Sequence, residues 1–220
     1  MRQSRAIVLA VVLVFFGIMA LSHTLISVMA HEKVGIERVT NMTTCESNNP
    51  NAIVEDGICF ETLVPEAMVR LPKYGEETPV KFGVRITNQA STPYRFDLPF
   101  VLPEMLNPHG ERMQISLNKN ATRKVKESDI PVIMPGQSLE FLMDAKFNWY
   151  SEDCLRLVGN AIYGGIWIFW YFKPGKYQVR FTYKNQLAKK EMIILEEGRT
   201  EIDGFWTGNF MTPFVDLILG

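Results

Sequence analysis

The chain has 220 residues, of which 47% are hydrophobic and 21% are charged. This length accommodates one globular domain and a targeting segment. Its 23 basic and 24 acidic residues give a net charge of -1, so the chain lacks the cationic excess that neutralises phosphates. We therefore expect no nucleic-acid partner.

The N-terminus is basic and then strongly apolar. Two arginines lie within residues 1–5, and residues 6–21 are uninterrupted apolar residues or glycine. This order is typical of an export signal, and residues 28–30 fit its cleavage rule. The same stretch could instead be retained as a transmembrane helix, with membrane association through residues 6–30. We expect residues 1–30 to form a signal peptide or membrane anchor. The protein would then be extracytoplasmic (periplasmic or secreted), or anchored in the membrane.

Three cysteines follow this segment. In an oxidising compartment we expect a disulfide between Cys45 and Cys59. Closing a loop of about 15 residues stabilises by about 3 kcal/mol in the chain-entropy model. Cys154 remains either as a buried thiol or as a partner for another chain. We expect no metal site, because the spacing lacks the close cysteine pairs and nearby histidines of zinc sites. Residues 31–66 are expected to be an extension holding the disulfide loop, and Asn41 and Asn120 begin glycosylation sequons in surface loops.

The remaining chain alternates between apolar and polar residues with a period of two, which is typical of half-buried strands. The predicted strands are residues 67–71, 80–87, 94–98, 113–117, 139–147, 177–183, 192–195 and 214–219. Pro99, Pro103 and Pro108 indicate an edge strand or a connection, and residues 149–160 are predicted to be irregular. Short strands separated by Pro and Gly turns predict an all-β antiparallel sandwich over residues 67–220.

The aromatic segment at residues 162–172 is apolar on both faces of a strand. It could be a central strand with one face in the core and the other under a loop. The alternative is an exposed aromatic patch that binds a protein, a glycan or a lipid surface. Our candidate partner contacts are Trp167 and Trp170 from this segment, together with Trp206 and His109 in turn regions.

Catalytic chemistry has little support in the sequence. His109 lies in a proline–glycine turn, whereas a general base needs an orienting partner and a cleft. The motifs of serine hydrolases, zinc proteases and phosphate-binding loops are missing from the sequence. We therefore expect a protein that is not an enzyme and that holds no cofactor.

Two features resemble immunoglobulin-like sandwiches. Residues 174–179 place Tyr177 two residues after a glycine, which resembles the tyrosine corner. Residues 84–88, followed by the turn at residues 135–138, are similar to bacterial extracytoplasmic modules and to the BsuPI-type proteinase-inhibitor fold. The C-terminal stretch, residues 206–215, resembles exported bacterial proteins with the same arrangement. This resemblance covers about residues 80–219 and implies an immunoglobulin-like sandwich. Its central positions are expected to hold aromatic and branched residues in place of the usual cysteine pair, namely Phe82, Val84, Val179 and Phe181.

We expect a non-enzymatic extracytoplasmic interaction or assembly module for an unknown protein or surface ligand. One alternative is a proteinase inhibitor that uses the loop at residues 119–130. A further alternative is a carbohydrate-binding module or an accessory domain of a hydrolase.

Overall fold

The computed structural model describes residues 35–39, 45, 48–118, 125–126, 129–161, 164–194 and 198–220. The chain divides into a unit at Met1–Lys33 and a compact unit at Val34–Gly220. The predicted signal or anchor, Asn41 and Asn120 all lie outside the described residues. Among the residues that are described, no helix is both long enough and apolar enough to cross a membrane.

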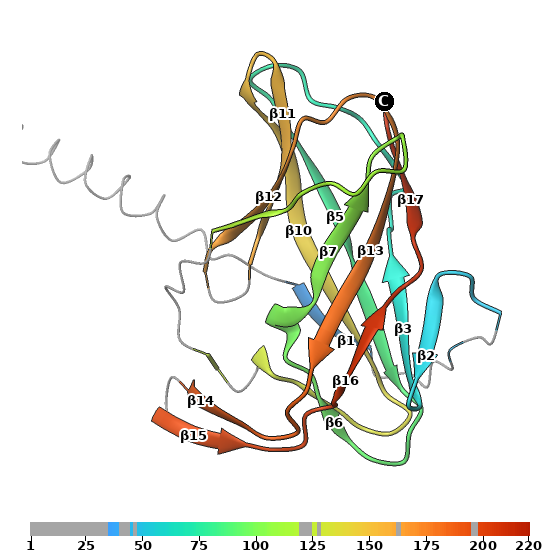
Figure 1. Ribbon diagram of the computed structural model, residues 1–220, viewed down its shortest axis with the longest axis vertical. Coiled ribbons are helices and arrows are strands. Elements are labelled where there is room, and N and C mark those ends of the chain that lie inside the picture. The colour runs from blue at the N-terminus through green and yellow to red at the C-terminus, as the bar shows by residue number, and fades with distance from the viewer. Residues whose placement is uncertain are drawn as a thin grey trace, which may run out of the picture. The chain divides into compact units, whose positions relative to one another are not determined.

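An eight-stranded antiparallel sheet forms one layer (Figure 1). Its strands, in spatial order, are β2 (Ala52–Glu55), β3 (Ile58–Leu63), β5 (Glu77–Asn88), β10 (Ser138–Ser151), β11 (Cys154–Asn160), β12 (Ile166–Trp170) and β8 (Ser116–Asn118), and β1 (Gly35–Val39) also pairs with β10. The two longest of these, β5 and β10, are neighbours over most of their length.

A five-stranded sheet forms the second layer around β13 (Gly175–Asn185). On one side β13 pairs with β7 (Leu102–Leu106). On its other side, the first half of β13 pairs with β17 (Val215–Leu219) and the second half pairs with β16 (Gly208–Met211). The short strand β4 (Met68–Val69) runs parallel to β17. Two small pairs complete the fold, β14 (Lys190–Ile194) with β15 (Gly198–Ile202) and β6 (Tyr94–Arg95) with β9 (Val132–Ile133).

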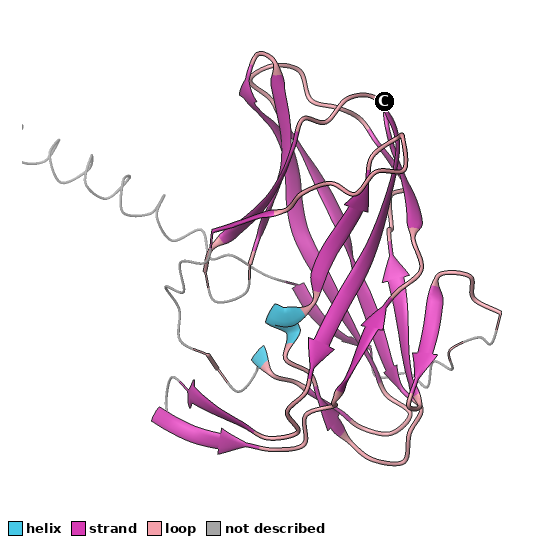
Figure 2. Cartoon of the chain, viewed as in Figure 1, coloured by secondary structure: helices cyan, strands magenta, loops and turns pink. Residues whose placement is uncertain are grey.

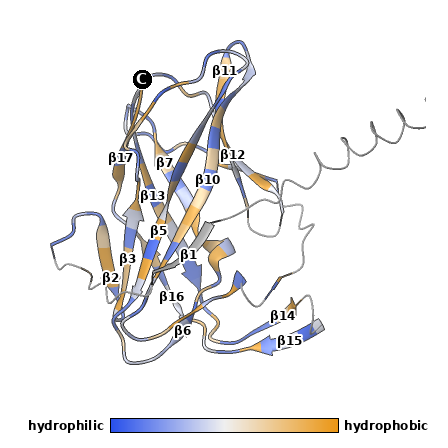
Figure 3. Cartoon of the chain, turned by 180° about the vertical axis from the view of Figure 1, so that it is seen from behind, coloured by the Kyte–Doolittle hydropathy of each residue, from blue (hydrophilic) through white to orange (hydrophobic). Residues whose placement is uncertain are grey.

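The core lies between the two sheets, because alternate side chains of the long strands point inward. Apolar and polar residues alternate along these strands (Figure 3). Phe82 of β5 meets Phe181 of β13 with ring centroids 6.0 Å apart. The described residues therefore form an all-β, sandwich-like fold with almost no helix (Figure 2). The positions expected to be central are all buried, namely Phe82, Val84, Val179 and Phe181.

Our prediction for residues 149–160 was wrong. Strand β10 continues to Ser151, and β11 begins at Cys154 after a turn of two residues. Leu155 and Leu157 are buried, so every second residue of β11 points inward. The next inward position is Gly159, which has no side chain, so the apolar–polar alternation of the sequence is interrupted there.

The proline-rich segment is an edge strand, as predicted, with Pro103 inside β7. The strand expected at residues 94–98 is shorter than predicted. It ends at Arg95 and gives way to a 3₁₀ turn at Leu98–Phe100, because Pro99 fits the start of a helical turn.

The predicted extension at residues 31–66 is not separate from the sandwich. Strands β1, β2 and β3 all belong to the eight-stranded sheet. Phe60 of β3 lies opposite Ile86 of β5 and is fully buried in the main core.

Candidate functional site

Two predicted partner contacts lie in the core instead of on the surface. Trp167 is 1% exposed and Trp206 is 2% exposed. Trp206 packs against Phe60, Phe96 and other rings of the core. Neither indole Nε1 has a hydrogen-bond partner, although buried donors are usually paired. These two tryptophans therefore belong to the core between the sheets and are not available to a partner.

Trp170, by contrast, reaches the surface and belongs to a cluster at one end of the sandwich. We call Tyr150, Arg156, Trp170 and Tyr171 the aromatic face. Tyr150 is the second-last residue of β10, and its ring meets that of Trp170 edge-on, with centroids 5.3 Å apart. The Arg156 guanidinium lies 5.1 Å from the centroid of Tyr150 and 5.6 Å from that of Trp170. Its Nε donates to Asn148 Oδ1 at 2.9 Å, so the cation is held over both rings.

Tyr171 occupies an unusual backbone conformation. Its φ of 64° lies in the left-handed region, which is costly for a bulky residue. The side chain is 72% exposed. The next residue, Phe172, returns to the core, where its amide donates to Leu155 O at 3.0 Å and its ring contacts Phe147. The backbone thus turns Tyr171 into solvent. Its two neighbours do not follow, because Trp170 packs against the sheet and Phe172 packs into the core.

The tyrosine corner predicted at Tyr177 is confirmed. Its hydroxyl accepts from the Lys173 amide at 3.0 Å and donates to the Lys173 carbonyl at 3.2 Å. These bonds fix the segment that follows Tyr171 directly, so the corner supports the conformation of the aromatic face.

A hollow of about 340 Å³ lies beside the aromatic face. The residues that line it include Trp170, Tyr171 and Tyr177, together with Gln114 and Ser116. Trp170 Nε1 donates to Ser116 Oγ at 3.2 Å, which holds the indole against β8. The hollow lies at the lower end of the size range of small-ligand sites.

His109 is exposed in a turn at the same end of the sandwich as Trp170. Asn107 Oδ1 accepts from the His109 amide at 2.9 Å and from the Glu111 amide at 3.0 Å. Asn107 lines the hollow, whereas His109 does not. The fold therefore brings the turn of His109 close to Trp170, while Tyr150 and Arg156 come from a hairpin that our sequence analysis missed.

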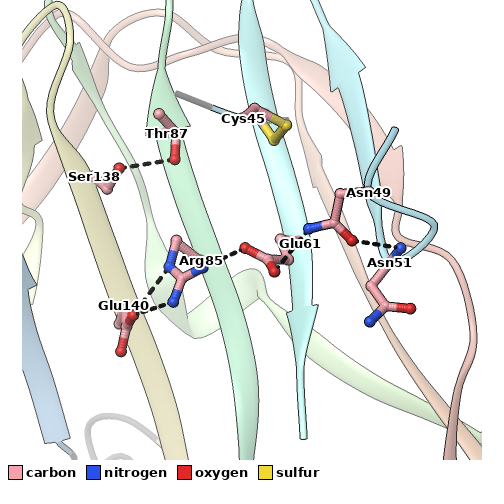
Figure 4. Close-up of polar contacts among 9 residues, drawn as sticks. Cys45, Asn49, Asn51, Glu61, Arg85, Thr87, Ser138 and Glu140 are labelled. Carbon is pink, nitrogen blue, oxygen red and sulfur yellow. Dashed lines mark hydrogen bonds and ion pairs between the residues drawn. A yellow bond between two sulfur atoms is a disulfide. The ribbon is translucent and has the colours of Figure 1, made fainter. Parts of the chain in front are cut away.

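The outer face of the eight-stranded sheet carries a polar network around Arg85 (Figure 4). Arg85 contacts Glu61 at 2.6 Å on β3 and Glu140 at 2.6 Å and 3.0 Å on β10. Thr87 and Ser138 share a hydrogen bond of 2.8 Å farther along the same strands. These polar groups satisfy one another across three strands, so the network is structural. Within the described part of the chain, no group of three His, Cys, Asp or Glu side chains could hold a metal ion.

The predicted disulfide between Cys45 and Cys59 is confirmed. Cys154 is a buried free thiol, which was the first of the two alternatives that the sequence left open for this cysteine. The disulfide indicates that the chain folds in an oxidising, extracytoplasmic compartment. Most of the proposed inhibitory loop at residues 119–130 lies outside the described residues.

No protein-family model matches the chain. A comparison with curated proteins also finds no match. Among solved structures, the chain is similar to a crystal structure of ycdA from Bacillus subtilis, a protein proposed to be a lipoprotein. The identity is 12% and the TM-score is 0.30, over 71% of this chain and 39% of the other, so the chain spans about two fifths of that protein. A match at this level establishes neither a family nor a function.

Proposed function

We propose that this protein is a non-enzymatic extracytoplasmic interaction module that binds a partner through the aromatic face. Residues 6–30 would export the chain or hold it at a membrane. The disulfide between Cys45 and Cys59 supports the extracytoplasmic location.

We further propose that the scaffold is an immunoglobulin-like sandwich. Three observations support this: two facing sheets built largely from antiparallel strands, the corner at Tyr177, and a central core without a cysteine pair. In such sandwiches, loops gather at the two ends, where they are free to bind partners. The aromatic face lies at one of these ends.

The conformation of Tyr171 is the observation that carries the proposal. A strained backbone that turns a large ring into solvent costs stability and is typical of functional positions. The neighbouring Tyr150 is 66% exposed, and the Arg156 guanidinium lies over the rings of Tyr150 and Trp170. Tyrosine, tryptophan and arginine are the residues most enriched at the energetic centres of protein interfaces.

A double variant, Tyr150→Ser with Tyr171→Ser, tests this proposal. Immobilised wild-type protein and variant are compared for the material they retain from the extracytoplasmic fraction of the native host. We expect the variant to lose at least about tenfold in retained partner, the scale of one interface hot spot. The matched control is Tyr74→Ser, since Tyr74 is 64% exposed outside the aromatic face. Equal retention by all three proteins would contradict the proposal.

A carbohydrate is the second candidate ligand, favoured by the hollow beside Trp170. Aromatic rings offer flat apolar surfaces, and Ser116 and Gln114, which line the same hollow, offer polar groups. Titration calorimetry with soluble oligosaccharides of the host envelope tests this candidate. Binding that Tyr171→Ser weakens supports it, whereas the absence of any heat at millimolar sugar removes it.

A further inference from the structure

The outer face of the five-stranded sheet carries a second feature, an open groove of about 410 Å³. Its floor crosses three strands in one row, because Thr182 of β13 lies opposite Leu102 of β7 and Met211 of β16. Met211 is exposed and Leu102 is partly exposed. A methionine on an exposed floor suits an interaction surface, because its flexible side chain adapts to different neighbours.

Cationic side chains lie on both sides of this row. Arg180 precedes Thr182 by two residues on the same face of β13, and Lys184 follows it by two. Arg180 Nη2 contacts Glu104 at 3.0 Å, and its guanidinium lies 4.3 Å from the centroid of the Phe214 ring. Arg112 contacts the same carboxylate at 3.4 Å but remains 72% exposed. Lys184 is exposed and has no ion-pair partner among the described residues.

The groove is therefore positive in a protein that is slightly negative overall. The residues that line it include three cations, Arg112, Arg180 and Lys184, and the single carboxylate of Glu104, which leaves an excess of two positive charges. The whole chain has a net charge of -1. Local charge of one sign attracts ligands of the opposite sign and fixes their register.

We propose that the groove binds an extended acidic peptide segment of a partner protein, in the pattern acidic–x–apolar–x–acidic. Extended chains rise about 3.3 Å per residue, so Arg180 and Lys184 are about 13 Å apart along β13. An extended peptide has the same rise, and every second side chain points to the same side. Two acidic residues four positions apart would thus meet Arg180 with Arg112 at one end and Lys184 at the other. The apolar residue between them would lie on Leu102 and Met211.

The partner peptide is less suited to extend the five-stranded sheet as an additional edge strand than to bind over its face. The edge strand β7 contains Pro103, which has no amide hydrogen to donate. The Met105 carbonyl already accepts from the Met113 amide at 2.9 Å. The partner segment would consequently bind over the face of the sheet, through side chains.

The test uses ¹⁵N-labelled protein and the peptide Gly-Glu-Ser-Leu-Ser-Glu-Gly, titrated by NMR. A peptide of the same composition with adjacent acids, Gly-Glu-Glu-Ser-Leu-Ser-Gly, controls for spacing. We expect the first peptide to shift the amide signals of Thr182 and Asn209 at millimolar concentration, and the second to bind several times more weakly. Lys184→Gln should weaken binding about fivefold, and added salt should weaken it further. Lys81→Gln, on the outer face of the other sheet, should leave binding unchanged.

Three results would overturn the inference. The first is the absence of shifts with either peptide, and the second is equal binding of both peptides. The third is that the protein binds phosphatidylglycerol vesicles but neither peptide, and that Lys184→Gln weakens the vesicle binding. This result would assign the groove to a membrane surface. The groove is separate from the aromatic face, so failure here leaves the proposed function standing.

Discussion

Gly159 of β11 lies directly opposite Trp167 of β12, and the indole ring covers the glycine. A Cβ atom added at residue 159 would overlap the six-membered ring of the tryptophan. The glycine thus makes room for a large side chain of the neighbouring strand, a known device for stabilising glycine within sheets. This pairing explains why Trp167 is buried, and it links the aromatic segment to the hairpin formed by β10 and β11.

The variant Gly159→Ala should destabilise the protein, because the new methyl group must displace the indole or the backbone. Overpacking of this kind costs about 1–3 kcal/mol in the free energy of unfolding. For a chain of this size, Tm should fall by about 2–4 °C per kcal/mol, measured by thermal denaturation. In a Trp167→Leu background the same substitution should cost much less. An equal cost in both backgrounds would show that the two residues do not interact.

The strands were largely predictable from sequence, whereas their contacts were not. Alternation along β5, β10 and β13 is local, so it identifies each strand and its buried face. The burial of Trp167 depends on Gly159, which lies on a different strand. The two residues become neighbours only because β11 pairs with β12. Similarly, the disulfide was predictable from two nearby cysteines, while the assignment of Trp206 to a surface turn overlooked the rings that enclose it.

The corner at Tyr177 gives a second prediction. Tyr177→Phe removes both hydrogen bonds to Lys173 and leaves its backbone groups without this partner. We expect a loss of about 0.5–1.5 kcal/mol in the free energy of unfolding, measured by urea denaturation. Tyr171→Phe is the matched control, because Tyr171 is exposed, and it should change stability by less than about 0.5 kcal/mol. Equal effects of the two substitutions would contradict the role of the corner.

The cysteines make a third prediction, which intact mass after alkylation can check. Native protein should take up almost no alkylating reagent, because Cys154 is buried and the other two cysteines are bonded. Unfolded protein should take up one group without reductant and three with reductant. Reduction should also destabilise the fold by about 3 kcal/mol in the chain-entropy model. Three groups without reductant would disprove the disulfide.

The ion pair of Glu77 and Lys146 predicts a small dependence of stability on pH. Hydrogen bonds from Lys146 and Asn148 lower the pKa of Glu77 below its ordinary value of 4.5. Ionised Glu77 therefore stabilises the fold above pH 4.5, and this contribution disappears as the pH falls through the lowered pKa. The loss should stay below about 1 kcal/mol, since the pair is largely exposed.

Urea denaturation between neutral and acid pH measures this effect. Glu77→Gln should lose less stability on acidification than the wild-type protein. Glu66→Gln, which removes an exposed carboxylate that forms no ion pair within the described part of the chain, should follow the wild-type curve. An identical acid response of Glu77→Gln and wild type would rule out this contribution.

The aromatic face was only partly visible in the sequence. The segment containing Trp170 and Tyr171 is conspicuous by its aromatic density. Tyr150 and Arg156, however, belong to β10 and β11, and they reach Trp170 only because β11 pairs with β12 in this register. The left-handed conformation of Tyr171 leaves no trace in sequence, because neither glycine nor asparagine occupies the position.

The most direct test of the proposed function is site-specific photo-crosslinking in the native host. A benzoyl-phenylalanine residue replaces Tyr171, Tyr150 or Tyr74 in separate variants, and adducts formed on irradiation are resolved by mass. The proposed function predicts an adduct of the same mass at positions 171 and 150, with little or none at position 74. Adducts of equal yield at all three positions, or an adduct at position 74 alone, would contradict it.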